Sequence, residues 1–348
     1  MDHMKVIKQA WNTTWSYKAL WIFGILLALG SGGGGGGSGN SGTQFSGGAG
    51  EWDFPNTFEM PEIATGVIVA VVAFCGLILL LSIATVMARY VSEVSLIRMV
   101  DDHEETGEKH TIKEGFRLGW SKGAWKIFLL DLLVTVVIGA GMVLVLLLAA
   151  APLLFWITKS DALRAIGTVA AIGLIMLAVL LAIAVATVVN TLVHFVRRAV
   201  ILEEKGIFKA LRESFAFVRA HLKDVALMWL LMFGINLAVT LAMIPVVLLL
   251  LVLGGVTGAL PGLALGGLVS LVSQSETLPW IIGGGIGALI FIAVIAIPSL
   301  FAGGVFKTFE SSVWTLTYRE LHALEQIEAP EVPAVPAAPI LPEAVVEG

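Results

Sequence analysis

Long apolar runs alternate along the chain with short segments that carry most of its charge. A helix needs about 20 residues to cross a bilayer. Six runs approach or exceed that length, at residues 19–36, 66–89, 124–150, 165–195, 225–253 and 280–306. The run at 19–36 is the weakest, because its strongly apolar part covers only residues 20–29. The pattern predicts an all-α integral membrane protein with six transmembrane helices.

A secretory signal peptide is an alternative for the first run. Lys5, Lys8 and Lys18 would form its basic region, and residues 21–30 its apolar region. The segment before this run is, however, one copy of a repeat that continues along the chain, so we favour a membrane span.

The repeat is an apolar triplet with i, i+4, i+8 spacing. Its copies are Ile7/Trp11/Trp15, Ile112/Phe116/Trp120, Ile207/Leu211/Phe215 and Val305/Phe309/Val313. This spacing places each triplet on one face of a helix. A short helix with an apolar stripe and a basic face lies in the headgroup plane of a membrane. We therefore expect cytoplasmic interfacial helices, in which Lys209, Arg212 and Arg219 contact lipid headgroups from the side opposite Phe215.

Each repeat unit predicts an interfacial helix, a span outward, an external connection and a span back. Such units return to the side on which they began, so the copies are parallel repeats, related by an axis along the membrane normal. The sequence predicts three hairpins, each preceded by a cytoplasmic amphipathic helix. The hairpins are either arranged with pseudo-threefold symmetry or packed irregularly.

These boundaries divide the chain into seven segments. They are an interfacial helix and first span (1–30), an external Gly/Ser-rich loop (31–65), a second span with a cytoplasmic loop (66–110), a second hairpin (111–205), a third hairpin (206–303), a C-terminal amphipathic helix (304–327) and a Pro/Ala/Glu-rich tail (328–348). In the third hairpin we expect residues 254–279 to be a glycine-rich, apolar outer connection, with a short helix that dips into the interface as an alternative that Pro261 and the glycines make less favourable. The composition of the tail predicts disorder.

Composition and charge set the orientation. Hydrophobic residues make up 57% of the chain, and the mean hydropathy is +0.93. All 21 Lys and Arg residues except Lys159 and Arg164 fall at the N-terminus, at 89–126, at 197–223 or in the C-terminal segment. By the positive-inside rule both termini are cytoplasmic. Helical spans exclude an outer-membrane barrel, so we expect the bacterial plasma membrane.

Few polar groups lie within the predicted spans. They include Asp131, Asn190, His194 and Asn236. Ionisable residues in a membrane are functional suspects, and these four could form a polar pocket or a proton-handling site. Hydrogen bonding between helices, at about 0.6 kcal/mol per contact, is the interpretation that we favour. Pro245 and Pro298 should kink their helices, and we interpret these kinks as structural.

The sequence contains no motif for metal binding, catalysis or nucleotide binding. Residues 101–110 combine Asp, Glu and His, but they lack a helical His-x-x-x-His pair, so we expect a solvated acidic loop and no metal site. A catalytic Ser/His/Asp pattern, a phosphate loop and a dinucleotide fingerprint are absent, and the single cysteine excludes a disulfide framework. Basic residues on the interfacial helices suit anionic lipids better than nucleic acid. We expect no enzyme activity and no cofactor.

A resemblance rests on the second basic segment. Its residues 197–206 read Arg-Arg-Ala-Val-Ile-Leu-Glu-Glu-Lys-Gly, and residues 210–215 read Ala-Leu-Arg-Glu-Ser-Phe. This segment is similar to the cytoplasmic repeat in the membrane domain of some bacterial glycerophosphoryl diester phosphodiesterases, and in small multi-span bacterial proteins of unknown function. Residues 318–321 resemble the ending of that domain. The resemblance implies the membrane domain alone, because no segment is long and polar enough for the catalytic barrel.

The sequence therefore favours a non-catalytic membrane module that contacts lipids or a partner. A transporter for small molecules or lipids is the first alternative, and it requires a polar cavity near Asp131, Asn190 and Asn236. An intramembrane enzyme is the weakest alternative, because no nucleophile and base converge in the sequence.

Overall fold

The computed structural model describes residues 1–30, 65–158, 160–272 and 277–328, and within these ranges the regular structure is entirely helical. In chain order the elements are α1 (His3–Ser16), α2 (Ala19–Gly30), α3 (Thr65–Thr106), α4 (Ile112–Gly119), α5 (Lys122–Ala150), the 3-10 helix η1 (Ala151–Ile157), α6 (Asp161–Leu202), α7 (Ile207–Ala220), α8 (Leu222–Val272) and α9 (Leu278–Glu328). The predicted Gly/Ser-rich loop and the predicted tail fall almost wholly outside the described residues.

Five of these helices are long and apolar enough to cross a membrane: α3, α5 with η1, α6, α8 and α9. The all-α class is therefore confirmed for the described residues, and the five long apolar helices are compatible with a multi-pass membrane protein. The first predicted span is represented by α2, which has 12 residues. At 1.5 Å per residue α2 is about 18 Å long, short of the roughly 30 Å hydrocarbon core. The count of six spans is not confirmed.

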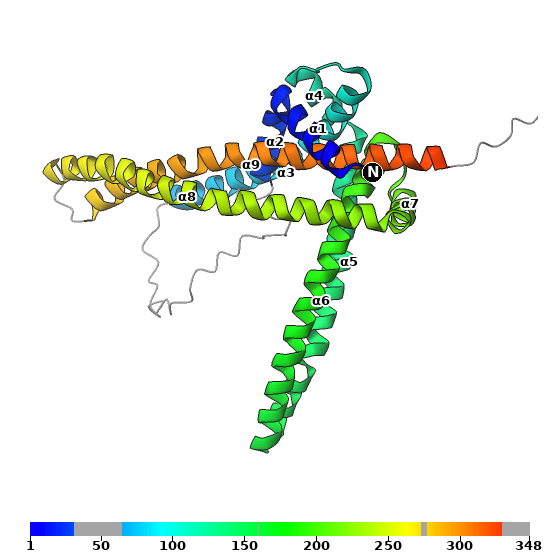
Figure 1. The fold of residues 1–348 in the computed structure, drawn as a ribbon. Coiled ribbons are helices and arrows are strands. Elements are labelled where there is room, and N and C mark those ends of the chain that lie inside the picture. Colours follow the sequence, from blue (N-terminus) through cyan, green and yellow to red (C-terminus); the bar gives the residue numbers. More distant parts are fainter. Residues whose placement is uncertain (31–64, 159, 273–276, 329–348) are drawn as a thin grey trace, which may run out of the picture.

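The helices form two antiparallel hairpins that point in different directions (Figure 1). One hairpin consists of α8 and α9, and α2 and α3 lie along it. The other consists of α5 and α6, which project steeply away from the first (Figure 1). Within the described residues the structure therefore does not confirm one bundle of three parallel hairpins.

The short helices and the polar ends of the long helices meet in one region, which we call the junction. It contains α1, α4, α7, the C-terminal parts of α3, α6 and α9, and the N-terminal parts of α5 and α8 (Figure 1). The N-terminal segment lies beside the C-terminal part of α9, where the Asp2 amide donates to Glu320 at 3.2 Å. Each described hairpin thus leaves the junction and returns to it, as the positive-inside pattern requires.

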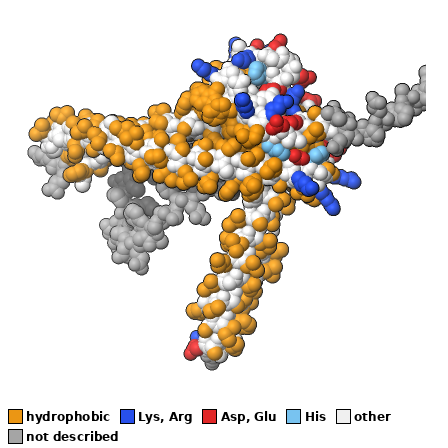
Figure 2. Space-filling view, viewed as in Figure 1, with side chains coloured by type: hydrophobic (Ala, Val, Ile, Leu, Met, Phe, Trp, Pro, Cys, Tyr) orange, Lys and Arg blue, Asp and Glu red, His pale blue; other side chains and the backbone are white. Residues whose placement is uncertain are grey.

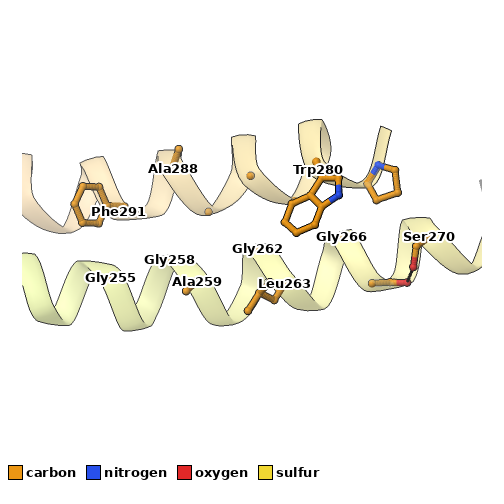
Figure 3. A pocket seen from close by; sticks show the side chains of 15 residues that line it. Gly255, Gly258, Ala259, Gly262, Leu263, Gly266, Ser270, Trp280, Ala288 and Phe291 are labelled. Atoms are coloured by element: carbon orange, nitrogen blue, oxygen red, sulfur yellow. Dashed lines mark hydrogen bonds between the residues drawn. The ribbon is translucent and has the colours of Figure 1, made fainter. Parts of the chain in front are cut away.

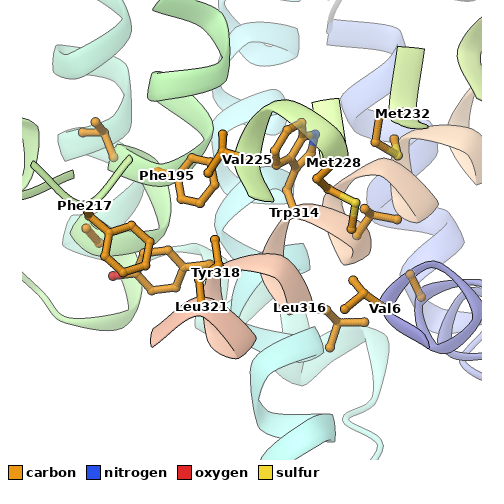
Figure 4. Close-up of a cluster of buried hydrophobic side chains, with 14 of the residues drawn as sticks. Val6, Phe195, Phe217, Val225, Met228, Met232, Trp314, Leu316, Tyr318 and Leu321 are labelled. Atoms are coloured by element: carbon orange, nitrogen blue, oxygen red, sulfur yellow. The ribbon is translucent and has the colours of Figure 1, made fainter. Parts of the chain in front are cut away.

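The main hydrophobic core lies in the junction, where α1, α5, α6, α7, α8 and α9 contribute to it (Figure 4). Phe195, Trp314 and Tyr318 pack at its centre through ring contacts of 5.8–6.3 Å. Along the hairpins, by contrast, large apolar side chains are mostly exposed. Lipid can cover such a surface, whereas a soluble protein rarely exposes contiguous apolar area of this extent.

A row of glycines corrects the prediction of an outer connection at residues 254–279. In the structure α8 continues to Val272, so most of that segment is helix. Four glycines at i+4 spacing (Gly254, Gly258, Gly262 and Gly266) face α9 (Figure 3). A Cβ on Gly258 would lie 2.6 Å from the carbonyl oxygen of Gly287. The segment was predicted to be a connection because glycine favours loops, but small residues also let two helices pack closely, as they do here.

The C-terminal amphipathic helix predicted at residues 304–327 is not a separate element. It is the last part of α9, which runs without a break from Leu278 to Glu328. The fourth apolar triplet is correspondingly part of the junction core, because Phe309 and Val313 are buried. The other three triplets keep exposed aromatic side chains, among them Trp11, Trp120 and Phe215.

The acidic loop predicted at residues 101–110 is also partly helical, because α3 extends to Thr106. Its carboxylates have protein partners: Asp101 pairs with Arg319 of α9, and Asp102 lies 3.1 Å from His110. The loop ends at a capping box, in which Thr111 and Glu114 satisfy each other's backbone amides at the start of α4. This segment is therefore bound into the junction.

Candidate functional site: the ion-paired junction

Among the residues that the structure describes, charged side chains are confined to the ends of the hairpins. On the face shown in Figure 2, basic and acidic groups gather over the junction, and a few mark the tip of the α5–α6 hairpin. The tip carries Asp161 and Arg164, whose charged groups are 3.5 Å apart. The surface between is apolar (Figure 2). The junction is therefore the region in which polar chemistry can occur.

The centre of the junction is an ion cluster made by three helices. Arg197 of α6 binds the two carboxylate oxygens of Asp131 of α5 at 2.6 and 2.8 Å, and its other terminal nitrogen pairs with Glu93 of α3. The side chains of the three residues are only 9–15% exposed. One terminal nitrogen of the guanidinium thus donates to both oxygens of Asp131, and such contacts between a guanidinium and a carboxylate are charge-assisted and strong. The cluster thus fixes α3, α5 and α6 relative to one another.

The neighbouring Arg198 connects the cluster to α9. It is 2% exposed, and its guanidinium donates to the carbonyl oxygens of His194 at 2.6 Å and Ser311 at 3.1 Å. With Arg197 it gives two cations beside the two carboxylates of Glu93 and Asp131, so the buried charges balance. Balance matters because an unpaired buried charge costs several kcal/mol.

A second cluster lies where α6 turns into α7. Lys205 pairs with Glu203 and, at 2.6 Å, with Glu213 of α7, while Tyr318 of α9 donates to Glu203. Burial raises the pKa of Glu203. The hydrogen bonds from Lys205 and Tyr318 lower it by more than burial raises it, so the pKa lies below its ordinary value. The same two carboxylates raise the pKa of Lys205. Both groups are thereby held in their charged forms.

The polar residues that were predicted within the spans have different surroundings in the structure. Asp131 binds Arg197, whereas the His194 ring stacks on Trp314 at 5.0 Å with an interplanar angle of 7°. Asn236 accepts a 3.5 Å hydrogen bond from Thr240 on its own helix. Asn190 lies half-buried one turn before His194. Asp131, His194 and Asn236 thus each contact a different partner.

The transporter interpretation requires a polar cavity beside Asp131. In the described structure the guanidinium of Arg197 occupies that position, and neither of two surface grooves shown by the structure is lined by Asp131. Pro245 and Pro298, which were interpreted as structural kinks, lie within α8 and α9, and both helices continue through these residues.

Sequence reasoning missed Glu93, Arg197 and Arg198 as parts of this cluster. Glu93 follows the second apolar run, and the two arginines were assigned to a solvated basic segment. Arg197 and Glu93 are 104 residues apart in sequence, so no local spacing could reveal their contact. One feature of the sequence could have indicated the cluster. Glu93 is the one charged residue between positions 91 and 97, and a charged group in such a stretch predicts a buried partner of opposite charge.

The two grooves lie on the α8–α9 hairpin. The first, about 980 Å³, runs along the glycine row between α8 and α9, with Trp280 and Phe291 at its sides (Figure 3). The second, about 740 Å³, lies between α1, α8 and α9, beside the junction. Within the described ranges, no group of three or more His, Cys, Asp or Glu side chains is placed to hold a metal ion.

Comparison with known proteins adds a family but no activity. No curated protein and no solved structure matches the chain. The resemblance to the membrane domain of the phosphodiesterases therefore gains no support. A family model described as a family of unknown function matches residues 8–324. This match covers nearly all of the helices described above, and it shows that the chain belongs to the family of unknown function DUF7544.

Proposed function

We propose that the protein is a non-catalytic, multi-pass module of the bacterial plasma membrane that contacts anionic lipid headgroups through the helices of its junction. Its apolar hairpins cross the membrane, and α1, α4 and α7 lie on the cytoplasmic surface. Both termini are on that side. The exposed face of α7 is the observation that carries this proposal.

The exposed face of α7 combines large apolar groups with positive charge. Phe208 is 76% exposed and Phe215 is 58% exposed. They lie seven residues apart, so they point to the same side of the helix. The opposite side is fixed to the junction core by Ala210 and Phe217, which are buried. In water two such phenylalanines would be unfavourable, whereas at a membrane surface they enter the boundary between headgroups and acyl chains.

Arginines lie beside these phenylalanines. Arg212 and Arg219 are both exposed, and they stand three and four residues from Phe215, which makes them its neighbours on the helix surface. The sequence prediction had placed them on the opposite side. Their long side chains can reach headgroup phosphates while the rings enter the apolar boundary. Lys209 points roughly a third of a turn away from the two phenylalanines, and its ammonium group lies 3.8 Å from the Glu213 carboxylate. We therefore assign it to the side of α7 that faces water.

Site-directed spin labelling of α7 tests this orientation. In a Cys75→Ser background of the full chain, single variants Phe215→Cys and Lys209→Cys are labelled and reconstituted in bilayers that contain phosphatidylglycerol. We expect the label at 215 to be more accessible to oxygen than to a water-soluble nickel complex, because oxygen concentrates in the acyl region. The label at 209 should show the reverse.

Equal access of the nickel complex to both labels would contradict the proposal, because α7 would then lie in water. Reconstitution in neutral phosphatidylcholine serves as the control. There the label at 215 should move toward water, since the attraction of Arg212 and Arg219 for anionic headgroups is lost.

A further inference from the structure

The groove between α1 and the α8–α9 hairpin is apolar at one end and basic at the other. Its apolar wall comes mainly from Ile235 and Val239 of α8 and from Ala302 and Phe306 of α9. Its other wall is α1, which contributes Lys5, Lys8 and Trp11. The groove is open, and its volume of about 740 Å³ is large enough for part of a lipid.

The two lysines are available for an external anion. They stand three residues apart, so they lie on one side of α1, and both are exposed. In the part of the chain that the structure describes, neither ammonium group forms a salt bridge or a hydrogen bond. The one carboxylate in the groove, that of Asp2, caps α1 by accepting from the Lys5 amide at 3.1 Å. The groove therefore keeps an excess of positive charge.

Aromatic rings place the groove at the level of the membrane surface. Trp11 contacts Phe309 edge-on at 5.9 Å and Trp15 at 5.6 Å, and the contacts continue through Trp21 to Phe301. Tryptophan gathers at the boundary between headgroups and hydrocarbon. The basic end of the groove is thus beside the headgroups, and its apolar end continues onto the lipid-covered hairpin.

We propose that this groove binds one anionic phospholipid, with the phosphate between Lys5 and Lys8 and an acyl chain against Val239 and Phe306. The inference rests on the proposed orientation of the junction at the membrane, and it adds a defined lipid site. Charge complementarity selects an anionic lipid as the occupant. A neutral lipid would fill the apolar end but leave both lysines without a partner.

Native mass spectrometry of the full chain in detergent tests the site. Phosphatidylglycerol and phosphatidylcholine of equal chain length are titrated separately. We expect one phosphatidylglycerol to bind tightly and phosphatidylcholine to bind more weakly. In the variant Lys5→Gln/Lys8→Gln the affinity for phosphatidylglycerol should fall about 25-fold, or about fivefold for each lysine. The control variant Arg164→Gln, which removes an exposed charge at the tip of the α5–α6 hairpin, away from the groove, should retain the wild-type affinity.

A second pair of variants tests the apolar end. Val239→Trp should fill the groove and lower the affinity for both lipids at least tenfold. Leu241→Trp, at an exposed position outside the groove, should change neither affinity. Equal losses in the two charge variants, or unchanged binding in Val239→Trp, would overturn the lipid site. Neither result would alter the spin-label outcome on α7, so the proposed function and the lipid site can fail separately.

Discussion

Removing the guanidinium at the centre of the junction should destabilise the protein strongly. Arg197→Met keeps a side chain of comparable length but leaves Asp131 and Glu93, both at most 15% exposed, without their partner. Breaking a buried ion pair in this way costs about 3–5 kcal/mol, mainly because the remaining charge stays desolvated. We expect a loss of at least that size here, since two carboxylates share the lost cation.

The loss can be measured by equilibrium unfolding in mixed micelles, with tryptophan fluorescence followed against the mole fraction of sodium dodecyl sulfate. The matched control is Arg164→Met at the tip of the α5–α6 hairpin, where the side chain is 40% exposed and its partner Asp161 is 97% exposed. An exposed pair contributes at most about 1 kcal/mol. The control should therefore remain within about 1 kcal/mol of the wild type.

A rescue variant separates charge from packing. Combining Arg197→Met with Glu93→Gln and Asp131→Asn removes all three charges and keeps the side-chain shapes. If uncompensated charge causes the loss, the triple variant should recover most of it, because neutral replacements of a buried ion cluster are often tolerated. A loss below about 1 kcal/mol in the single variant, or no recovery in the triple variant, would refute the reasoning.

Two further predictions concern the glycine row and the second ion cluster. Gly258→Ala should lower the free energy of unfolding by about 1–3 kcal/mol in the same assay, because its Cβ would meet the Gly287 carbonyl. Gly255→Ala, whose Cβ meets no atom within 4 Å, should be neutral or stabilising. Equal effects of the two substitutions would contradict close α8–α9 packing. The lowered pKa of Glu203 means that the folded state binds fewer protons, so its stabilising contribution is present above the ordinary pKa and is lost as pH falls through the lowered one. In Glu203→Gln the free energy of unfolding should therefore fall less steeply as pH is lowered in the acid range. A pH dependence identical to that of the wild type would show that Glu203 does not contribute.

The sequence was sufficient to predict the features that depend on composition along one helix. Apolar runs identified α3, α5, α6, α8 and α9, and the distribution of lysine and arginine predicted a shared polar side. The i, i+4, i+8 triplets predicted α1, α4 and α7 as short helices. These features follow from how a single segment partitions between water and lipid, so no knowledge of the partner segment is needed.

Features that depend on the partner segment were missed. The glycines from 254 to 266 look like a loop until the glycines of α9 are placed opposite them. Asp131 was recognised as a costly group, but its pairing with Arg197 depends on how α5 and α6 meet. The same holds for the last triplet: Phe309 is spaced like an interfacial residue, and only the surrounding helices make it part of the core.

The contact between α2 and α9 has a consequence for biosynthesis. The hydroxyl of Thr308 in α9 donates to the carbonyl oxygen of Leu20 in α2 at 3.2 Å, across 288 residues of sequence. Gly24 of α2 fits directly against the backbone of Gly304. α2 packs mainly against α3 and α9, and of these two helices only α3 is made soon after α2. The ribosome must therefore finish α9 before α2 reaches its final environment, so α2 is made well before its packing can be completed.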